Sequence, residues 1–116
     1  MQRQFRLRHG ADFERLRTEG RTLRHPFLIM ATAPNALGHN RYGFITSRHL
    51  GGAVVRNRVR RILREAVRQS SPRLKSGYDV TFIARNGIVG QAYSTVSGAL
   101  EELFKRAGLW QEEGKT

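Results

Sequence analysis

One stretch constrains what this chain can fold into more than any other, and it covers residues 51–69, GGAVVRNRVRRILREAVRQ. At 3.6 residues per turn its apolar residues fall on one side, which is typical of an amphipathic helix packed on a core. The apolar side consists of Val55, Val59, Ile62, Leu63, Ala66 and Val67. The other side consists of Arg56, Arg58, Arg60, Arg61, Arg64 and Arg68, with Glu65 as its acidic residue. The stretch therefore predicts a helix with a core-facing side and a strongly positive side.

The positive side of this helix has two interpretations. It is either a solvated polar face or a surface that binds a polyanion. Solvated faces usually mix charges, because opposite charges four residues apart attract and like charges repel. Glu101 and Lys105 show such mixing farther along the chain. We favour a polyanion-binding helix, since guanidinium groups fork onto phosphate oxygens.

Length and composition narrow the class of protein. A chain of 116 residues is expected to form a single RNA-binding domain, 1–116, and its net charge of +12 makes nucleic acid the leading candidate partner. The absence of cysteine excludes disulfides and cysteine-bound zinc. The longest apolar run, residues 27–33, is too short to span a bilayer, and no signal peptide precedes it, so we expect a cytoplasmic protein without a membrane partner.

The remaining pattern predicts an α+β fold. A short helix is expected from Asp12, as its N-cap, to Gly20, and a last helix from about residue 94 to residue 107. Strands are expected at residues 27–33, 41–47 and 78–85. Residues 1–9 are interpreted as a basic extension, which lies either along RNA or along the domain's own surface, and residues 110–116 as a flexible tail.

No residue pattern in the chain indicates catalysis. The histidines, at positions 9, 25, 39 and 49, lack the short spacings of metal ligands, and the acidic residues are dispersed. The chain contains no glycine-rich nucleotide motif with a lysine and no serine in a nucleophile motif. We therefore predict no catalytic residue, no metal ligand and no protein-bound cofactor.

A second binding surface is indicated near the first helix. Phe13 and Arg17 lie one helical turn apart, where they can face rings and apolar side chains of the sheet. The sheet residues in question are Phe27, Ile29, Phe44 and Phe82. A basic groove with rings suits single-stranded nucleic acid. The competing interpretation, that these rings are core residues, is favoured on the residues alone.

Residues 51–65, with Arg56-Asn57-Arg58 at their centre, resemble the RNR signature of the bacterial ribonuclease P protein subunit. The resemblance continues through Asp12-Phe13, Ser47, Tyr78-Asp79 and Leu103-Phe104, and so covers nearly the whole chain. It implies a two-layer α/β sandwich with a small mixed sheet of about four strands and three helices. The implied order is a helix, three strands with the signature helix between the second and third, then a last strand and helix. It also implies a left-handed βαβ crossover, against the general right-handed rule.

The resemblance further implies that RNA is the catalyst and that the protein assists it. The protein subunit would bind the catalytic RNA, hold the 5′ leader of precursor tRNA between the first helix and the sheet, and aid the binding of metal ions such as Mg²⁺ by the complex. The RNA-subunit contacts would be Arg56, Asn57, Arg58, Arg60, Arg61, Arg64 and Arg68. The leader contacts would be Phe13, Arg17, Met30, Ser47, Arg48 and His49. Arg17 and Met30 stand where many members of the family carry rings, and His49 stands where a basic side chain is common.

Two other classes of protein remain open. A ribosomal or general RNA-binding protein would share the charge but would not prefer ribonuclease P RNA. A protein-only nuclease would cut RNA without an RNA cofactor. The oligomeric state is not determined by the sequence.

Overall fold

The computed structural model describes residues 3–7 and 9–111. Within them the α-helices are α1 (Gly10–Glu19), α2 (Ala53–Ser70) and α3 (Tyr93–Arg106). The strands are β1 (Arg21–Arg24), β2 (Leu28–Pro34), β3 (Arg41–Ile45) and β4 (Tyr78–Ala84). Short 3-10 turns are η1 (Arg3–Phe5), η2 (Arg48–Leu50), η3 (Ser71–Arg73) and η4 (Asn86–Ile88). No helix among the described residues has the length and apolar character needed to cross a membrane.

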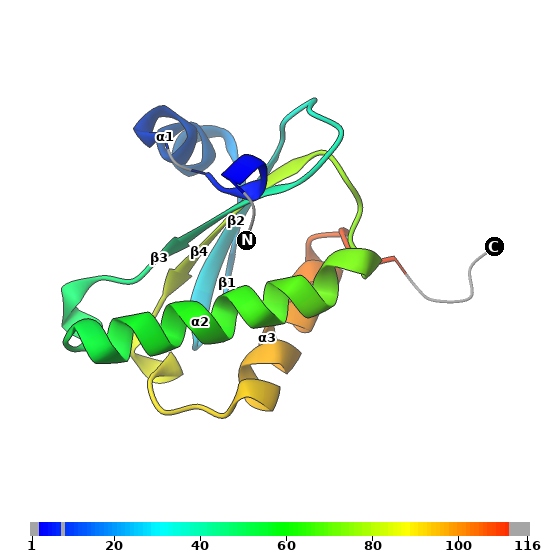
Figure 1. Ribbon diagram of the computed structural model, residues 1–116. Helices are drawn as coiled ribbons and strands as arrows, with labels where there is room; N and C mark the ends of the chain where they lie inside the picture. The colour runs from blue at the N-terminus through cyan, green and yellow to red at the C-terminus, as the bar shows by residue number, and fades with distance from the viewer. Residues whose placement is uncertain (1–2, 8, 112–116) are drawn as a thin grey trace.

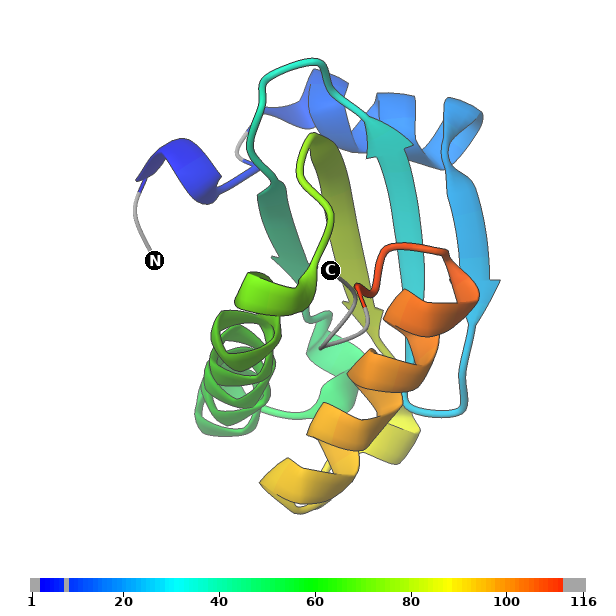
Figure 2. The ribbon, with the colours of Figure 1, turned by 90° about the vertical axis from the view of Figure 1, so that its right-hand side faces the viewer.

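The four strands form one mixed sheet in the order β1-β2-β4-β3. β2 pairs antiparallel with both β1 and β4, whereas β3 pairs parallel with β4. α2 and α3 cover one face of the sheet, and the shorter α1 lies against the other (Figures 1 and 2). The α+β fold, the mixed sheet of four strands and the three helices expected from the sequence are therefore confirmed.

The core follows the alternation of side chains along the strands. On the face toward α2 and α3, Met30 and Phe82 are fully buried together with Leu63 of α2 and Phe104 of α3. On the other face a smaller cluster consists of Leu7, Leu16, Ala31 and Ala33, with Phe13 packed against it. The main core thus fixes α2 firmly, while α1 is held by few apolar contacts.

The β3-α2-β4 connection is left-handed, as the resemblance implies. In Figure 2 both strands point down, α2 and α3 lie on the near side of the sheet, and β4 lies to the right of β3. A right-handed connection would place β4 to the left in this view.

Several local expectations are corrected by the structure. β1 was not expected, because its sequence RTLR has no apolar alternation and three of its four residues are exposed. No strand stands between β4 and α3, where η4 lies instead, so α2 falls between the third and fourth strands. α1 begins at Gly10 with His9 at the N-cap position, which places Asp12 inside the first turn. β3 ends at Ile45, two residues before the expected end.

The described parts of both terminal segments pack against the domain. Within the N-terminal segment, Leu7 donates its amide to the Tyr42 carbonyl at 2.9 Å, so residues 3–7 lie along the edge of β3. At the other end Trp110 forms a bridge with Leu74 and is half-buried, so the packed part of the chain extends past residue 109. Residues 112–116 of the expected tail lie outside the described residues.

Candidate nucleic-acid interface

α2 presents its basic residues outward because its apolar side is buried. Val59, Leu63 and Val67 are at most 3% exposed. Gly51, just before the helix, has φ 141°, a left-handed value that favours glycine and turns the chain from η2 into α2. We call the outward residues the arginine face: Arg56, Asn57, Arg58, Arg60, Arg61, Arg64 and Arg68. The structure brings all of these predicted residues onto one helix, with Arg56 and Arg60 half-buried and the others exposed.

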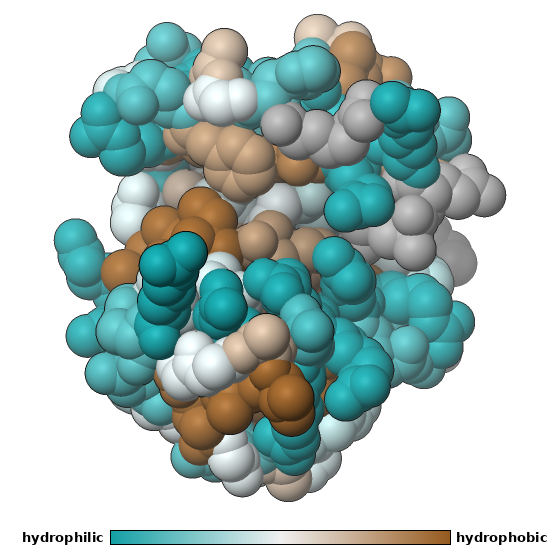
Figure 3. Space-filling model, turned by 60° about the vertical axis from the view of Figure 1, so that its left-hand side comes forward, coloured by the Kyte–Doolittle hydropathy of each residue, from teal (hydrophilic) through white to brown (hydrophobic). Residues whose placement is uncertain are grey.

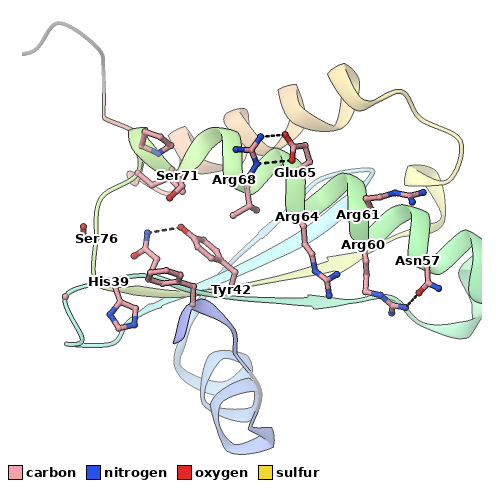
Figure 4. A pocket seen from close by; sticks show the side chains of 16 residues that line it. His39, Tyr42, Asn57, Arg60, Arg61, Arg64, Glu65, Arg68, Ser71 and Ser76 are labelled. Carbon is pink, nitrogen blue, oxygen red and sulfur yellow. Dashed lines mark hydrogen bonds and ion pairs between the residues drawn. The ribbon is translucent and has the colours of Figure 1, made fainter. Parts of the chain in front are cut away.

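Two arginines of this face point from α2 toward β3 and are held by uncharged partners (Figure 4). Arg60 donates hydrogen bonds to the Thr46 hydroxyl and to the Asn57 side-chain carbonyl. The Arg64 guanidinium lies 5.8 Å from the centre of the Phe44 ring. None of these partners is a carboxylate, so both guanidinium groups are positioned without being neutralised.

The rest of the arginine face carries little compensating charge. Arg58 and Arg61 have no hydrogen-bond or ion-pair partner within the described residues. Glu65, which lies between them and Arg68, is bound by Arg68 at 2.7 Å. Hydrogen bonds from Arg68, and secondarily from Gln69, lower the pKa of Glu65 to about 2. Glu65 therefore neutralises Arg68 and leaves the remaining arginines free to bind anions.

A groove of about 860 Å³ opens beside the arginine face (Figure 4). Its lining includes Arg60, Arg61 and Arg64 from α2, Tyr42 from β3, Phe5 from η1 and His39 from the turn before β3. The Phe5 and His39 rings meet edge-on, with centres 5.3 Å apart. Sequence reasoning missed these three ring residues, because they come together only when the N-terminal segment lies along β3. The available signal was a ring, Phe5, between Arg3 and Arg6.

The second predicted surface, between α1 and the sheet, centres on Phe13. Figure 3 shows apolar residues in a hollowed band between two hydrophilic lobes on one face of the molecule. Phe13 is half-buried and its ring lies over Gly43, where a Cβ would be 2.7 Å from a ring carbon. Ile45, two residues after Gly43 in β3, is 37% exposed. Phe13 thus has a partly accessible ring and also packs on the minor core.

The other predicted leader contacts have different surroundings. Arg17 is exposed and pairs with Glu14 on its own helix. Arg48 and His49 are exposed, and the His49 ring forms a hydrogen bond with the Ser47 hydroxyl. We call Phe13, Arg17, Ser47, Arg48 and His49 the leader surface.

Met30 does not belong to that surface. Its side chain is 0% exposed and lies in the core that faces α2 and α3, on the side of the sheet opposite α1. Phe44 and Phe82 lie on that same side, stacked with ring centres 5.4 Å apart, so they do not form a groove with Phe13. The run FLIMATA is apolar throughout, and this uniformity concealed which face each residue occupies.

A buried carboxylate, Asp79 of β4, ties α1 to the sheet. It accepts hydrogen bonds from Arg41 at 2.9 and 2.7 Å, from Asn35 at 2.9 Å and from Arg15 of α1. Burial alone would raise the pKa of Asp79, but the hydrogen bonds from Arg41 and Asn35 and the two arginine charges outweigh it and lower the pKa. Arg41 also contacts Asp12 of α1 at 3.3 Å. The network therefore sets the position of the helix that carries Phe13.

Metal-ligating side chains do not gather at either surface. Among residues 3–7 and 9–111 no group of three or more histidine, aspartate or glutamate side chains is placed to hold a metal ion. The side chains of the arginine face and the leader surface are mainly cationic, and such donors do not suit Mg²⁺.

A small α+β fold with a largely uncompensated arginine face and a partly aromatic cleft is typical of RNA-binding proteins, and the relatives of this chain define the family within that class. The ribonuclease P family model matches residues 1–108. The ribonuclease P protein component of Roseiflexus castenholzii is 42% identical over 112 residues, which cover 96% of this chain and 92% of that protein. That of Chloroflexus aurantiacus is 43% identical over 110 residues, covering 94% and 82%.

Solved structures agree with the sequence relatives. The RNase P protein of Staphylococcus aureus superposes with a TM-score of 0.85 at 27% identity, covering 92% of this chain and 98% of that one. The RNase P protein of Thermotoga maritima gives a TM-score of 0.81 at 28% identity, covering 87% and 96%. The chain therefore belongs to the ribonuclease P protein family and is a protein component of that tRNA-processing ribonucleoprotein.

Proposed function

We propose that the arginine face of α2 binds the RNA subunit of ribonuclease P. The observation that carries this proposal is the state of Arg60 and Arg64, which are positioned by Thr46, Asn57 and Phe44 rather than by carboxylates. Such groups keep their charge for an external anion, and they need little reordering when phosphate binds. Arg58 and Arg61 add unpaired charge to the same face.

The leader surface is proposed to hold the 5′ leader of precursor tRNA. Phe13 offers a ring whose edge is packed and whose exposed part can stack on a base, while Arg17 and Arg48 supply charge for the backbone. Ser47 and His49, which are joined to each other by a hydrogen bond, are proposed as further leader contacts. Met30 is not included, because its burial leaves nothing to contact.

Catalysis is assigned in this proposal to the RNA subunit. The protein would bring the RNA subunit and the leader together, and Mg²⁺ would bind to RNA phosphates rather than to this chain. The chain is proposed to act in the cytoplasm and without a membrane partner. Its contribution is electrostatic, since guanidinium groups reduce the repulsion between the two RNA backbones.

Reconstitution tests the proposal and the division of roles within it. The chain is first freed of bound RNA by high salt and nuclease treatment, and the nuclease is removed. It is then mixed with precursor tRNA, either alone or together with a ribonuclease P RNA. We expect removal of the 5′ leader at low Mg²⁺ only when both components are present. Metal-dependent cleavage by the RNA-free chain would overturn the assignment of catalysis to RNA.

A competition assay addresses the general RNA-binding alternative. We expect ribonuclease P RNA to displace a labelled copy of itself at much lower concentration than a ribosomal RNA fragment of equal length. Equal displacement by the two competitors would show that the chain is a general RNA-binding protein.

A further inference from the structure

The groove beside the arginine face has two chemically different ends. At one end Arg60 and Arg64 point toward β3 with their charges uncompensated. At the other end lie His39 and Tyr42 (Figure 4), and the Phe5 ring meets the His39 ring there. A groove that joins fixed cations to rings suits a strand of nucleic acid whose bases are unstacked.

The ring end is held in place by hydrogen bonds and ring contacts, and of its three residues only Tyr42 belongs to the main core. Tyr42 is 5% exposed, and its hydroxyl accepts a hydrogen bond from Asn40 at 3.1 Å. The segment that carries Phe5 is fixed by the amide of Leu7 on the Tyr42 carbonyl at 2.9 Å. The His39 ring is 3.2 Å from the Gln4 carbonyl and meets the Phe5 ring. Phe5 belongs to neither core cluster, so its ring is held at the groove without a packing role.

We propose that this groove binds a short unpaired stretch of the ribonuclease P RNA, with a base against Phe5 and His39 and backbone phosphates on Arg60 and Arg64. The inference rests on the proposed function of the arginine face and adds to it a base contact. Double-stranded RNA cannot place a base face against these rings, because the bases of a duplex are stacked on each other and their faces are covered. The groove is also separate from the leader surface, since Phe13 does not line it.

Chemical probing of the RNA subunit, without tRNA, tests this assignment. Base-specific reagents such as dimethyl sulfate are applied to free RNA and to its complex with the chain. The ring variants are Phe5→Ala, Phe5→Leu and His39→Ala. The matched control is Leu37→Ala, which removes a side chain 48% exposed in the same turn as His39 but outside the groove. Thermal melting establishes that each variant is folded, and Phe5→Leu keeps an apolar side chain while removing the ring.

We expect the wild-type chain to protect one or a few unpaired bases, and the Phe5 variants to restore their reactivity. The RNA affinity should fall about 5- to 150-fold for Phe5→Ala, which corresponds to the loss of one stacked base. Leu37→Ala should leave both the protection and the affinity for the RNA subunit unchanged.

Three results would overturn parts of the argument separately. If the wild-type chain does not bind the RNA subunit, the proposed function itself fails. If it binds and protects bases that all three ring variants still protect, the groove assignment fails while the arginine face stands. If protected bases are found only in the leader of added precursor tRNA, the groove binds substrate and the assignment to the RNA subunit is wrong.

Discussion

Arg58 and Arg61 are exposed arginines of α2 without a partner among the described residues, and each allows a direct prediction. Arg58→Ala or Arg61→Ala should weaken binding to the RNA subunit. The loss of affinity should be the same whether the substrate carries a long or a short leader, because phosphate contacts position a partner without reading its sequence. Each change should reduce the slope of log affinity against log salt by about 0.7 to 0.9. Binding measured between 50 and 200 mM salt checks this, and an unchanged slope would contradict a phosphate contact.

A change at Glu65 should strengthen binding to the RNA subunit rather than weaken it. Its pKa of about 2 keeps it ionised through the neutral range, where it neutralises Arg68. Glu65→Gln should therefore raise the affinity for the RNA subunit several-fold at low salt, by about the same factor at pH 5.5 and pH 8. Glu101→Gln on α3, which removes the ion pair with Lys105 instead, is the matched control and should have little effect on RNA binding. Weaker binding by Glu65→Gln would show that this carboxylate makes a favourable contact.

At the scale of elements, the packing of α1 on β3 depends on the close contact between the Phe13 ring and Gly43. A Cβ at Gly43 would lie 2.7 and 2.9 Å from two ring carbons of Phe13, so Gly43→Ala must displace that ring. We expect a loss of about 1 to 3 kcal/mol in affinity for precursor tRNA. The affinity for mature tRNA, which has no leader, should scarcely change. Phe13→Ala should give the same pattern, whereas Gly10→Ala, where a Cβ meets nothing within 4 Å, should not.

The same experiment distinguishes the leader surface from a purely structural role. The free energy of unfolding is measured beside the binding assays, since overpacking by itself costs about 1 to 3 kcal/mol of stability. Equal losses of affinity for leader-bearing and leaderless tRNA would refute the leader assignment for Phe13.

The sequence predicted some elements and not others for physical reasons. α2 was predicted closely because a helix buried on one side imposes its period on the sequence, and its arginines then had to lie outside. β1 was not, because RTLR has no pattern of its own and is a strand only through pairing with β2. Met30 was placed on the wrong face of the sheet for a related reason: strands covered on both sides show little alternation. The ring end of the groove depends on the path of residues 3–7, which no local pattern encodes.

At the scale of the whole molecule, Asp79 links α1 to the sheet through Arg15 and Arg41. Asp79→Asn should lower the free energy of unfolding at pH 7 by about 3 kcal/mol, because it leaves two partly buried guanidinium groups without their carboxylate. Asp12→Asn should cost much less, since Asp12 is more exposed and lies 3.3 Å from Arg41. Chemical denaturation of the three proteins measures this, and equal stabilities would show that the network contributes nothing.

The pH dependence of stability follows from the lowered pKa of Asp79. The unfolded-state value is about 3.9, so the ionised carboxylate stabilises the fold above about pH 4 and this contribution is lost as the pH falls through the folded-state value. The wild-type chain should therefore lose stability below pH 4 more steeply than Asp79→Asn. Parallel curves for the two proteins would contradict the assignment.

The strand order has a consequence for how the chain is made. β4 is the last strand to be synthesised, yet it lies between β2 and β3 and joins them. A nascent chain that ends before Tyr78 holds β3 and the apolar side of α2 without the strand on which both depend. Sheet completion must therefore wait until the ribosome has released residues 78–84, and until then this cationic chain emerges, with its core still open, beside the large RNA of the ribosome itself.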